Sequence, residues 1–411
     1  MLSKEQNELL CRVGPGTPMG NMLRQYWTPA LRSAKLVADG APERVRLFGQ
    51  DFVAFRDTNG NVGFLDEGCP HRGVSLALGR NEECGLRCIF HGWKINVDGQ
   101  VVEVPSEPAG SNLASKVRVN HYPVREAGGM VWVYLGKEET LPPFPAFEFT
   151  NLPPESVVVR KALNKCNWVQ ALEGLLDSSH VNSLHKSWLQ TPQPVQGAFA
   201  GMLGDSAPRF EVEDRPYGLN IKAKRVLGDG TLVNRYTEYA LPTFCFIPNA
   251  LETLRVMAFP VAIDDYNTWF WEISYNPTGG PMDAKTSDEL RNVGIMGDDP
   301  DNYYQPAWGP EKVWGQDREM MRQGHFTGFI AFPFEDFAVQ ESQGALVDRS
   351  KEHLGMSDVA VIRARRLLLE QVQKFREGEA LRGQAAPVDF GAIHGVHEIL
   401  PAPAQPHEVN S

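Results

Sequence analysis

The first third of the chain alternates short apolar runs with turn signals. The apolar runs cover residues 45–48, 53–55, 62–65 and 131–135. Turn sequences such as Asp98-Gly99 separate them, and this spacing predicts a small all-β domain over residues 23–145. The domain ends at a proline-rich linker, residues 141–145. Before it, Leu2, Leu9 and Leu10 stand among polar residues and predict an N-terminal helix within residues 1–22.

The remaining pattern predicts one larger domain over residues 146–390. Helical periodicity covers residues 168–184 and 357–377. Strand-like runs cover residues 219–226, 232–239, 253–261 and 268–274. Strands without regular helix alternation indicate an antiparallel sheet with helices, so the predicted class is α+β, an all-β domain followed by a helix-grip-like domain. Residues 391–411, rich in Ala and Pro, are expected to form a loosely ordered tail.

Composition narrows the function classes. The chain has 411 residues, of which 42% are hydrophobic and 22% charged, as in ordinary globular proteins. A net charge of −11 argues against nucleic acid as a partner, because neutralising phosphates requires a basic surface. No apolar run approaches the roughly 18 residues needed to span a bilayer, so we expect no membrane association and a cytoplasmic location. Six cysteines are too few for a disulfide scaffold and favour metal binding.

Two cysteine–histidine pairs lie in the predicted β domain. Cys69-Pro70-His71 is followed, after sixteen residues, by Cys88-Ile89-Phe90-His91. Two thiolates and two imidazoles suit either a tetrahedral zinc ion or a [2Fe–2S] cluster with two histidine ligands. The Cys-x-His spacing is unlike that of zinc fingers, and Gly73 and Gly92 allow backbone amides to approach cluster sulfurs. These details favour the cluster.

A second group of potential ligands follows in the larger domain. His180 and His185 are five residues apart, which is about 140° on an ideal helix, so one metal ion requires a break, plausibly at Asn182-Ser183. A carboxylate from residues 334–342 would complete two histidines and one acid, the facial triad that leaves open positions on Fe(II). Glu335 and Asp336 are the candidate acids.

These motifs resemble one known family, the Rieske non-haem iron ring-hydroxylating oxygenases, oxygenase (alpha) subunit. The first motif resembles the Rieske motif, which implies that Cys69, His71, Cys88 and His91 hold a [2Fe–2S] cluster. Asp177-x2-His180-x4-His185 resembles the family's iron site. Residue by residue, His180, His185 and Asp336 match the ligands of one mononuclear Fe(II), with Glu335 as the rival acid. Asp177 matches the catalytic acid that bridges the two metal centres, which lie in separate domains.

The resemblance extends to nearly the whole chain. Residues 14–20 and 26–30 are similar to the phthalate dioxygenase and phenoxybenzoate dioxygenase branch. That branch implies a homotrimer or stacked trimers, with electrons supplied by a flavin and iron–sulfur reductase that uses NADH. The implied substrates are O2 and an aromatic carboxylate of the phthalate, isophthalate, 3-phenoxybenzoate or 3-chlorobenzoate type.

An aromatic acid needs apolar walls and a cation, ideally an arginine, to hold its carboxylate. The resemblance favours Arg209 and Arg235, with Ser178 beside the bridging acid. The C-terminal helical segment carries Arg363, Arg365 and Arg366, which we interpret as a solvated face.

Three functions therefore remain open at this stage. The leading hypothesis is a terminal oxygenase that dihydroxylates an aromatic carboxylate. A Rieske monooxygenase or O-demethylase acting on a methoxy aromatic acid would share the same residues. A Rieske electron-transfer protein without oxygenase activity would not need His180, His185 and Asp336.

Overall fold

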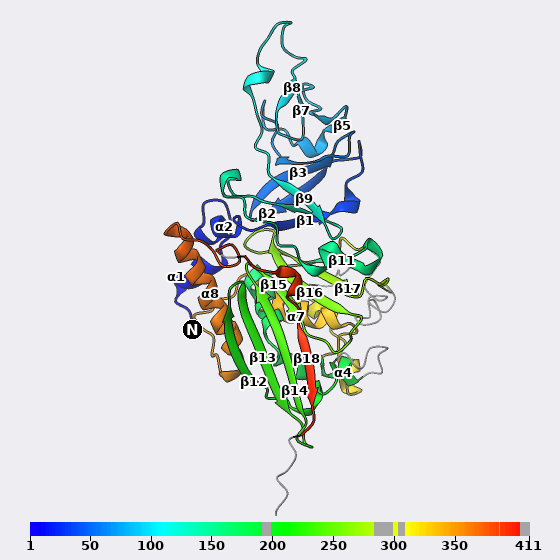
Figure 1. The fold of residues 1–411 in the computed structure, drawn as a ribbon, viewed down its shortest axis with the longest axis vertical. Helices are drawn as coiled ribbons and strands as arrows, with labels where there is room; N and C mark the ends of the chain where they lie inside the picture. Colours follow the sequence, from blue (N-terminus) through cyan, green and yellow to red (C-terminus); the bar gives the residue numbers. More distant parts are fainter. Residues whose placement is uncertain (191–198, 283–298, 303–308, 386, 403–411) are drawn as a thin grey trace, which may run out of the picture. The chain divides into compact units, whose positions relative to one another are not determined.

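The computed structural model describes residues 1–190, 199–282, 299–302, 309–385 and 387–402, and divides the chain into two units (Figure 1). The small unit comprises Arg12–Pro145 and Val261–Asp265. The large unit comprises Met1–Cys11, Ala146–Pro260 and Tyr266–Ser411. Each is described by itself.

The small unit is built almost entirely of short strands. Its one α-helix, among the described residues, is α2 (Pro18–Leu23), which Thr17 caps by accepting a hydrogen bond from the amide of Gly20. Three sheets follow, in the orders β1-β10-β9, β2-β3-β4 and β5-β6-β7-β8. The strands are β1 (Thr28–Arg32), β2 (Glu43–Leu47), β3 (Gln50–Arg56), β4 (Val62–Asp66), β5 (Arg80–Glu82), β6 (Gly85–Arg87), β7 (Lys94–Ile95), β8 (Val101–Glu103), β9 (Val124–Ala127) and β10 (Met130–Val133).

The core of the small unit reaches the predicted cysteine ligands. Val53, Phe55 and Leu65 from β3 and β4 are fully buried and belong to the same apolar cluster as Cys69 and Cys88. Residues 52–55 of β3 and 63–65 of β4 are all buried, so both faces of these strands are covered at their centres. Burying each such Val, Leu or Phe side chain contributes roughly 1.5–3 kcal/mol to the stability of the fold. The buried core therefore gives the loops of Cys69 and Cys88 a rigid base.

The large unit contains an eight-stranded sheet. Seven strands follow the order β11-β17-β16-β15-β14-β13-β12, and the eighth, β18, pairs with β14. Neighbouring strands of this sheet pair antiparallel. For example, β11 and β17 pair from Val157↔Tyr275 to Asn164↔Thr268. The predicted α+β class, with an all-β domain first, is confirmed. The strands are β11 (Val157–Asn164), β12 (Arg209–Arg215), β13 (Gly218–Val226), β14 (Leu232–Ala240), β15 (Phe244–Ile247), β16 (Arg255–Ala262), β17 (Thr268–Tyr275) and β18 (Val396–Leu400).

The expectation of a loosely ordered tail over residues 391–411 is wrong for β18. Residues of β14 from Leu232 to Tyr236 pair with β18, and residues further along the same strand pair with β15. The C-terminal strand therefore pairs with the part of β14 that β15 leaves unpaired. Its backbone hydrogen bonds are supplied by a strand about 160 positions earlier, which local composition cannot reveal. Residues 403–411 lie outside the described part.

Helices of the large unit pack beside the sheet (Figure 1). Helix α3 contacts α1, α7 and α8 as well as β15 and β17. Its N-terminus is capped by Asn167, whose side chain accepts a hydrogen bond from the amide of Val169. Among the described residues, no helix is long and apolar enough to cross a membrane. The helices are α1 (Lys4–Cys11), α3 (Trp168–Leu176), α4 (Lys186–Gln190), α6 (Arg318–Arg322), α7 (Phe332–Ser342) and α8 (Val359–Arg376).

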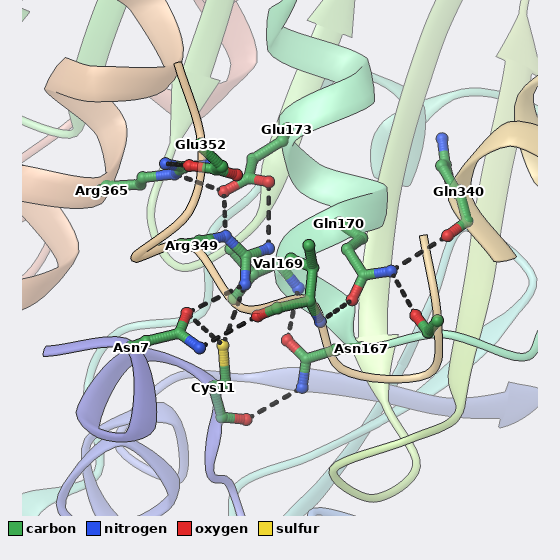
Figure 2. A network of polar contacts seen from close by, with 12 residues as sticks. Asn7, Cys11, Asn167, Val169, Gln170, Glu173, Gln340, Arg349, Glu352 and Arg365 are labelled. Atoms are coloured by element: carbon green, nitrogen blue, oxygen red, sulfur yellow. Dashed lines mark hydrogen bonds and ion pairs between the residues drawn. The ribbon is translucent and has the colours of Figure 1, made fainter. Parts of the chain in front are cut away.

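A buried ionic network joins the helices around α3 (Figure 2). The carboxylate of Glu173 on α3 accepts hydrogen bonds from Nε of Arg349 at 2.9 Å and Nε of Arg365 at 2.6 Å. Arg365 also bonds Glu352, and Arg349 reaches Cys11 on α1. Burial opposes the charge of Glu173, but the two guanidinium groups hold the pKa of its carboxyl below the usual range. The prediction that Arg365 belongs to a solvated face is wrong, because its partners bury it.

Replacing Glu173 by Gln should strongly destabilise the protein, because it leaves two buried guanidinium groups without their shared carboxylate. We expect the free energy of unfolding to fall by about 3–5 kcal/mol, measured from urea denaturation. The matched control is Glu370→Gln, which removes a partly exposed partner of Arg363 and should cost less than about 1 kcal/mol. Equal losses in both variants would contradict this role of the network.

Candidate functional site

The two cysteine–histidine loops of the small unit have the same backbone geometry. In the first, the amide of Cys69 donates to the carbonyl of Val74 at 2.8 Å, and the amide of Gly73 donates back to Cys69 at 2.8 Å. In the second, Cys88 and Trp93 form the same bond at 2.8 Å, and Gly92 returns to Cys88 at 2.9 Å. Gly73 and Gly92 have φ values of +74° and +75°, which glycine adopts without strain.

The loops bring the four predicted cluster residues together. Cys69 and Cys88 are each 3% exposed, and burial together with the neighbouring Cys88 raises the pKa of the Cys69 thiol. The ring centroids of His71 and His91 are 4.5 Å apart. Nδ1 of His91 is buried and has no hydrogen-bond partner within the part of the chain that the structure describes. Two buried sulfurs and an unused imidazole nitrogen fit a [2Fe–2S] cluster with mixed ligands.

Residues outside the four predicted ligands also support this site. The indole of Trp93 stacks on His71 with a centroid distance of 4.7 Å and an interplanar angle of 5°. Its Nε1 donates to the hydroxyl of Ser106 at 3.1 Å, which fixes the ring. A Cβ atom on Gly92 would meet Cγ of Pro105 at 2.8 Å, so a second loop lies close to this turn. Nearby, Phe90 is 51% exposed.

The segment that carries the second site leaves the helical path earlier than predicted. We expected a helix over residues 168–184 with a break at Asn182-Ser183, but α3 ends at Leu176. Asp177 is extended, with φ −86° and ψ 112°, and its Oδ1 accepts a hydrogen bond from the amide of Ser179 at 2.6 Å. Such side chain-to-backbone bonds compete with helix. His180 then lies in a single 3-10 turn, His180–Asn182, and His185 directly precedes α4.

The structure brings His180, His185 and Asp336 together, with one ligand atom from each within 4.8 Å of the others. Oδ1 of Asp336, on α7, lies 3.6 Å from Nε2 of His180 and 3.4 Å from Nε2 of His185. His185 is fully buried, and its Nε2 has no hydrogen-bond partner among the described residues. A buried nitrogen without a partner, facing a carboxylate and a second imidazole, fits a metal ligand set of two histidines and one acid.

Glu335 occupies a different place from its neighbour Asp336. Its carboxylate lies 2.7 Å from Nδ1 of His185, on the side of the ring opposite Nε2, and is 1% exposed. The hydroxyl of Thr327 donates a hydrogen bond to Glu335. Glu335 therefore orients His185, as outer carboxylates do for metal-binding histidines, and Asp336 is the acid that faces both Nε2 atoms.

Charges within this group shift the titration of its members. Burial disfavours the charged imidazole of His185, but Asp336 and Glu335 outweigh it and raise the pKa of His185 to about 9. Burial likewise opposes the charge of Asp336, whose pKa is held below the usual range by His185 and His180. Asp177 also has a lowered pKa, because His180 Nδ1 lies 3.5 Å from its Oδ2 and outweighs burial. Negative charge is therefore concentrated where a cation would bind.

A buried arginine that we did not predict stabilises the loop around His180. Arg225 on β13 donates from Nη2 to the carbonyl of Ser178 at 2.7 Å and to Oδ1 of Asn182 at 3.0 Å. It is fully buried, and burial lowers its pKa to about 10. Because Ser178 and Asn182 lie on either side of His180, Arg225 fixes the backbone that presents this histidine.

A cavity of about 140 Å³ opens beside these residues. Its lining includes Asp177, Ser178, His180 and Asp336. The rest of the lining is mostly apolar and includes Trp188, Phe199, Ile247, Leu254, Val256, Phe270 and Phe332. The volume is similar to that of a cavity of about 150 Å³ that accommodates benzene in another protein. It therefore suits one aromatic ring.

The structure separates the two predicted substrate arginines. Arg235 on β14 lines the cavity and is 5% exposed. Arg209 lies on the edge strand β12 with its side chain exposed and is not among the lining residues, so the structure does not bring it to the cavity. The spacing of charges along a strand does not reveal which face turns inward, and for Arg209 the register with β13 decided it.

Arg235 is a buried cation without an acidic partner in the described structure. Its guanidinium carbon lies 5.5 Å from the centre of the Phe199 ring, and its Nε is buried without a hydrogen-bond partner. Burial, followed by repulsion from Arg225, lowers the pKa of Arg235 to about 9. Burying an unpaired charge is costly, and an anion beside this guanidinium would offset that cost.

Family models match both the small N-terminal part and the larger C-terminal part of the chain. The family model described as "Rieske [2Fe-2S] domain" matches residues 26–123, and "LigXa C-terminal domain like" matches residues 133–398. The phthalate 4,5-dioxygenase oxygenase subunit of Pseudomonas putida is 43% identical over 396 residues, which cover 93% of this chain and 89% of the relative. The 3-chlorobenzoate-3,4-dioxygenase oxygenase subunit of Comamonas testosteroni is 35% identical over 388 residues, covering 91% and 89%.

A solved structure has the same fold. The terminal oxygenase of carbazole 1,9a-dioxygenase from Nocardioides aromaticivorans superposes with a TM-score of 0.60 at 21% identity, covering 93% of this chain and 98% of the other. The domain matches imply one [2Fe–2S] Rieske cluster and one mononuclear iron in this enzyme. The chain belongs to the Rieske non-haem iron ring-hydroxylating oxygenases, as an oxygenase subunit of the phthalate dioxygenase branch.

Proposed function

We propose that this enzyme dihydroxylates an aromatic carboxylate in the cavity of its large unit. The observation that carries the proposal is Arg235, a buried guanidinium without a carboxylate partner among the described residues, which lines the same cavity as His180 and Asp336. A carboxylate bound to Arg235 would neutralise its charge and could form two parallel hydrogen bonds with it. The apolar walls would hold the ring between the arginine and the metal ligands.

The metal-binding roles follow from the donor atoms. We assign the cluster to Cys69, Cys88, His71 and His91, and the mononuclear iron to His180, His185 and Asp336. When bound, the cluster supplies single electrons, and the iron, with positions left open by three protein ligands, supplies a site where O2 is reduced. Glu335 holds the proton on Nδ1 of His185, which leaves Nε2 free to act as a ligand.

Asp177 is the residue that we propose to couple the two centres. One of its oxygens faces Nδ1 of His180, and its side chain is 28% exposed, so it remains accessible to another subunit. In a trimer, a carboxylate here would accept a hydrogen bond from an exposed cluster histidine of the neighbouring protomer. Its role in this chain would be to orient His180 and to hold that contact.

Electrons must come from outside the chain. Oxygenase subunits of this family work with a separate ferredoxin or reductase and with O2. We propose a flavin and iron–sulfur reductase that uses NADH as the donor, a homotrimer or stacked trimers as the assembly, and the cytoplasm as the compartment. The exposed Phe90, beside the cluster histidines, supports a contact with a redox partner at this end of the small unit.

The reaction is tested with a set of aromatic acids. O2 uptake and product are followed together for the phthalate isomers, 3-phenoxybenzoate, 3-chlorobenzoate and methoxybenzoates. We expect a cis-dihydrodiol or the catechol formed from it, with one O2 consumed per product. Formaldehyde in equal amount from a methoxybenzoate, without ring dihydroxylation, would contradict dioxygenation and support the O-demethylase alternative.

Replacing Arg235 by Met should remove the preference for an acid. We expect the KM for 3-chlorobenzoate to rise at least roughly thirtyfold, because a buried charge-assisted contact is lost, while the KM for 3-chlorobenzamide changes little. Arg209→Met is the matched control, since that side chain is exposed outside the cavity. An unchanged ratio of the two KM values in Arg235→Met would exclude Arg235 as the carboxylate receptor.

Replacing His180 by Ala should remove the mononuclear iron and leave the cluster. We expect the iron content to fall from about three to about two atoms per chain, with the visible absorption of the cluster unchanged and no product formed. His353→Ala, at an exposed histidine of the same unit, is the control and should retain all the iron. Normal oxygenation by His180→Ala would refute the assigned ligand set.

Replacing Asp177 by Asn should slow electron delivery without removing either metal. Asparagine has the same shape but no charge and presents one acceptor oxygen instead of two. We expect the reduced protein, mixed with O2 and 3-chlorobenzoate, to lose the electron of its cluster roughly ten- to a hundredfold more slowly, measured by stopped-flow absorbance. Identical rates in variant and parent would reject the coupling role.

A further inference from the structure

The C-terminal strand brings a histidine next to the proposed carboxylate receptor. Strand β18 pairs antiparallel with β14, and in this register His397 lies directly opposite Arg235. Directly opposite residues of an antiparallel pair point to the same face of the sheet. His397 therefore shares the sheet face of Arg235, although 161 residues separate them in the chain.

The hydrogen bonds of His397 define its tautomer. Nη1 of Arg235 lies 3.4 Å from Nδ1 of His397, and the carbonyl of Ala200 lies 3.1 Å from Nε2. A guanidinium can only donate, so Nδ1 must be the acceptor. A carbonyl can only accept, so Nε2 must carry the proton. Both contacts are satisfied together only by the neutral imidazole protonated on Nε2.

The electrostatic surroundings favour the same neutral form. Burial, followed by repulsion from Arg235, lowers the pKa of His397 to about 4. A neutral ring can stay against the guanidinium without repelling it and still accept its hydrogen bond.

Arg235 is thus held between two groups of the protein. The Phe199 ring lies against its guanidinium, and His397 accepts from Nη1. The neighbouring Ala200 anchors the far side of the imidazole, so residues 199–200 contribute to both contacts. A planar cation fixed in this way loses less rotamer freedom when it binds a planar anion.

We propose that His397 is a positioning residue that orients Arg235 toward the substrate carboxylate and thereby sets the preference of this enzyme for acids. The proposal rests on the proposed function, in which Arg235 binds that carboxylate. It makes the C-terminal strand a part of the substrate site, although His397 itself is not among the residues that line the cavity. The ring acts through Arg235 and touches no reacting atom.

The test separates the two nitrogens of His397. In His397→Asn the side-chain amide can take the position of Nδ1, and in His397→Gln it can take that of Nε2, whereas His397→Leu replaces both. We expect the KM for 3-chlorobenzoate to rise roughly tenfold in the Leu variant, to rise similarly in the Gln variant, and to be largely restored in the Asn variant. The KM for 3-chlorobenzamide and the iron content should stay at parent values in all three.

Two comparisons make the result decisive. His394→Leu, three residues earlier in the same segment and outside the cavity, should leave both KM values unchanged. Equal KM values for 3-chlorobenzoate in the Asn and Gln variants would overturn the proposal even if the Leu variant failed to fold. If Arg235→Met loses its preference for the acid while the His397 variants behave like the parent, only the role of His397 is refuted. If Arg235→Met keeps that preference, the proposed function itself fails.

Discussion

The turn after α3 is the constraint on which the large unit's site depends. The chain leaves the helix at Asp177 because the Asp177 carboxylate accepts the amide of Ser179, and Arg225 then holds the carbonyl of Ser178. An uninterrupted helix would hold His180 and His185 about 140° apart. The turn instead lets both Nε2 atoms face Asp336. A fully buried arginine on the sheet thus helps to set a geometry that the candidate ligands His180 and His185 would not have on one continuous helix.

Buried charge is used in two opposite ways in this unit. Around Glu173, guanidinium and carboxylate groups balance one another and join α1, α3 and α8 into one body (Figure 2). This balance keeps the end of α3, and therefore Asp177, in place. At Arg235 the protein leaves a cation without an acid among the described residues, and an aromatic ring and a neutral imidazole contact its guanidinium. The first arrangement stabilises the scaffold, and the second is the basis of the proposal that Arg235 binds an anion.

The sheet links these two regions. Strand β13 carries Arg225, and the adjacent β14 carries Arg235, so the residue that fixes the loop of His180 and the proposed carboxylate receptor stand on neighbouring strands. Strand β18 adds His397 to the free edge of β14. The spacing between Arg225 and Arg235 is therefore set by strand register, which shifts only in whole residues.

Local sequence was sufficient wherever chemistry is carried by neighbouring residues. The Cys-x-His and Cys-x2-His pairs and the strand runs each contain their own signal, since loop geometry and pleat are short-range properties. The spacing of His180 and His185 gained its meaning from the resemblance. Tertiary structure decided everything that depends on pairing between distant segments. The packing of α7 turns Asp336 toward Nε2 of His185 and Glu335 toward Nδ1, and strand register separates Arg235 from Arg209. Pairing between distant segments also decided that residues 396–400 form a strand and that Arg365 and Arg225 are buried. Their partners lie tens to hundreds of residues away, so no local pattern records them.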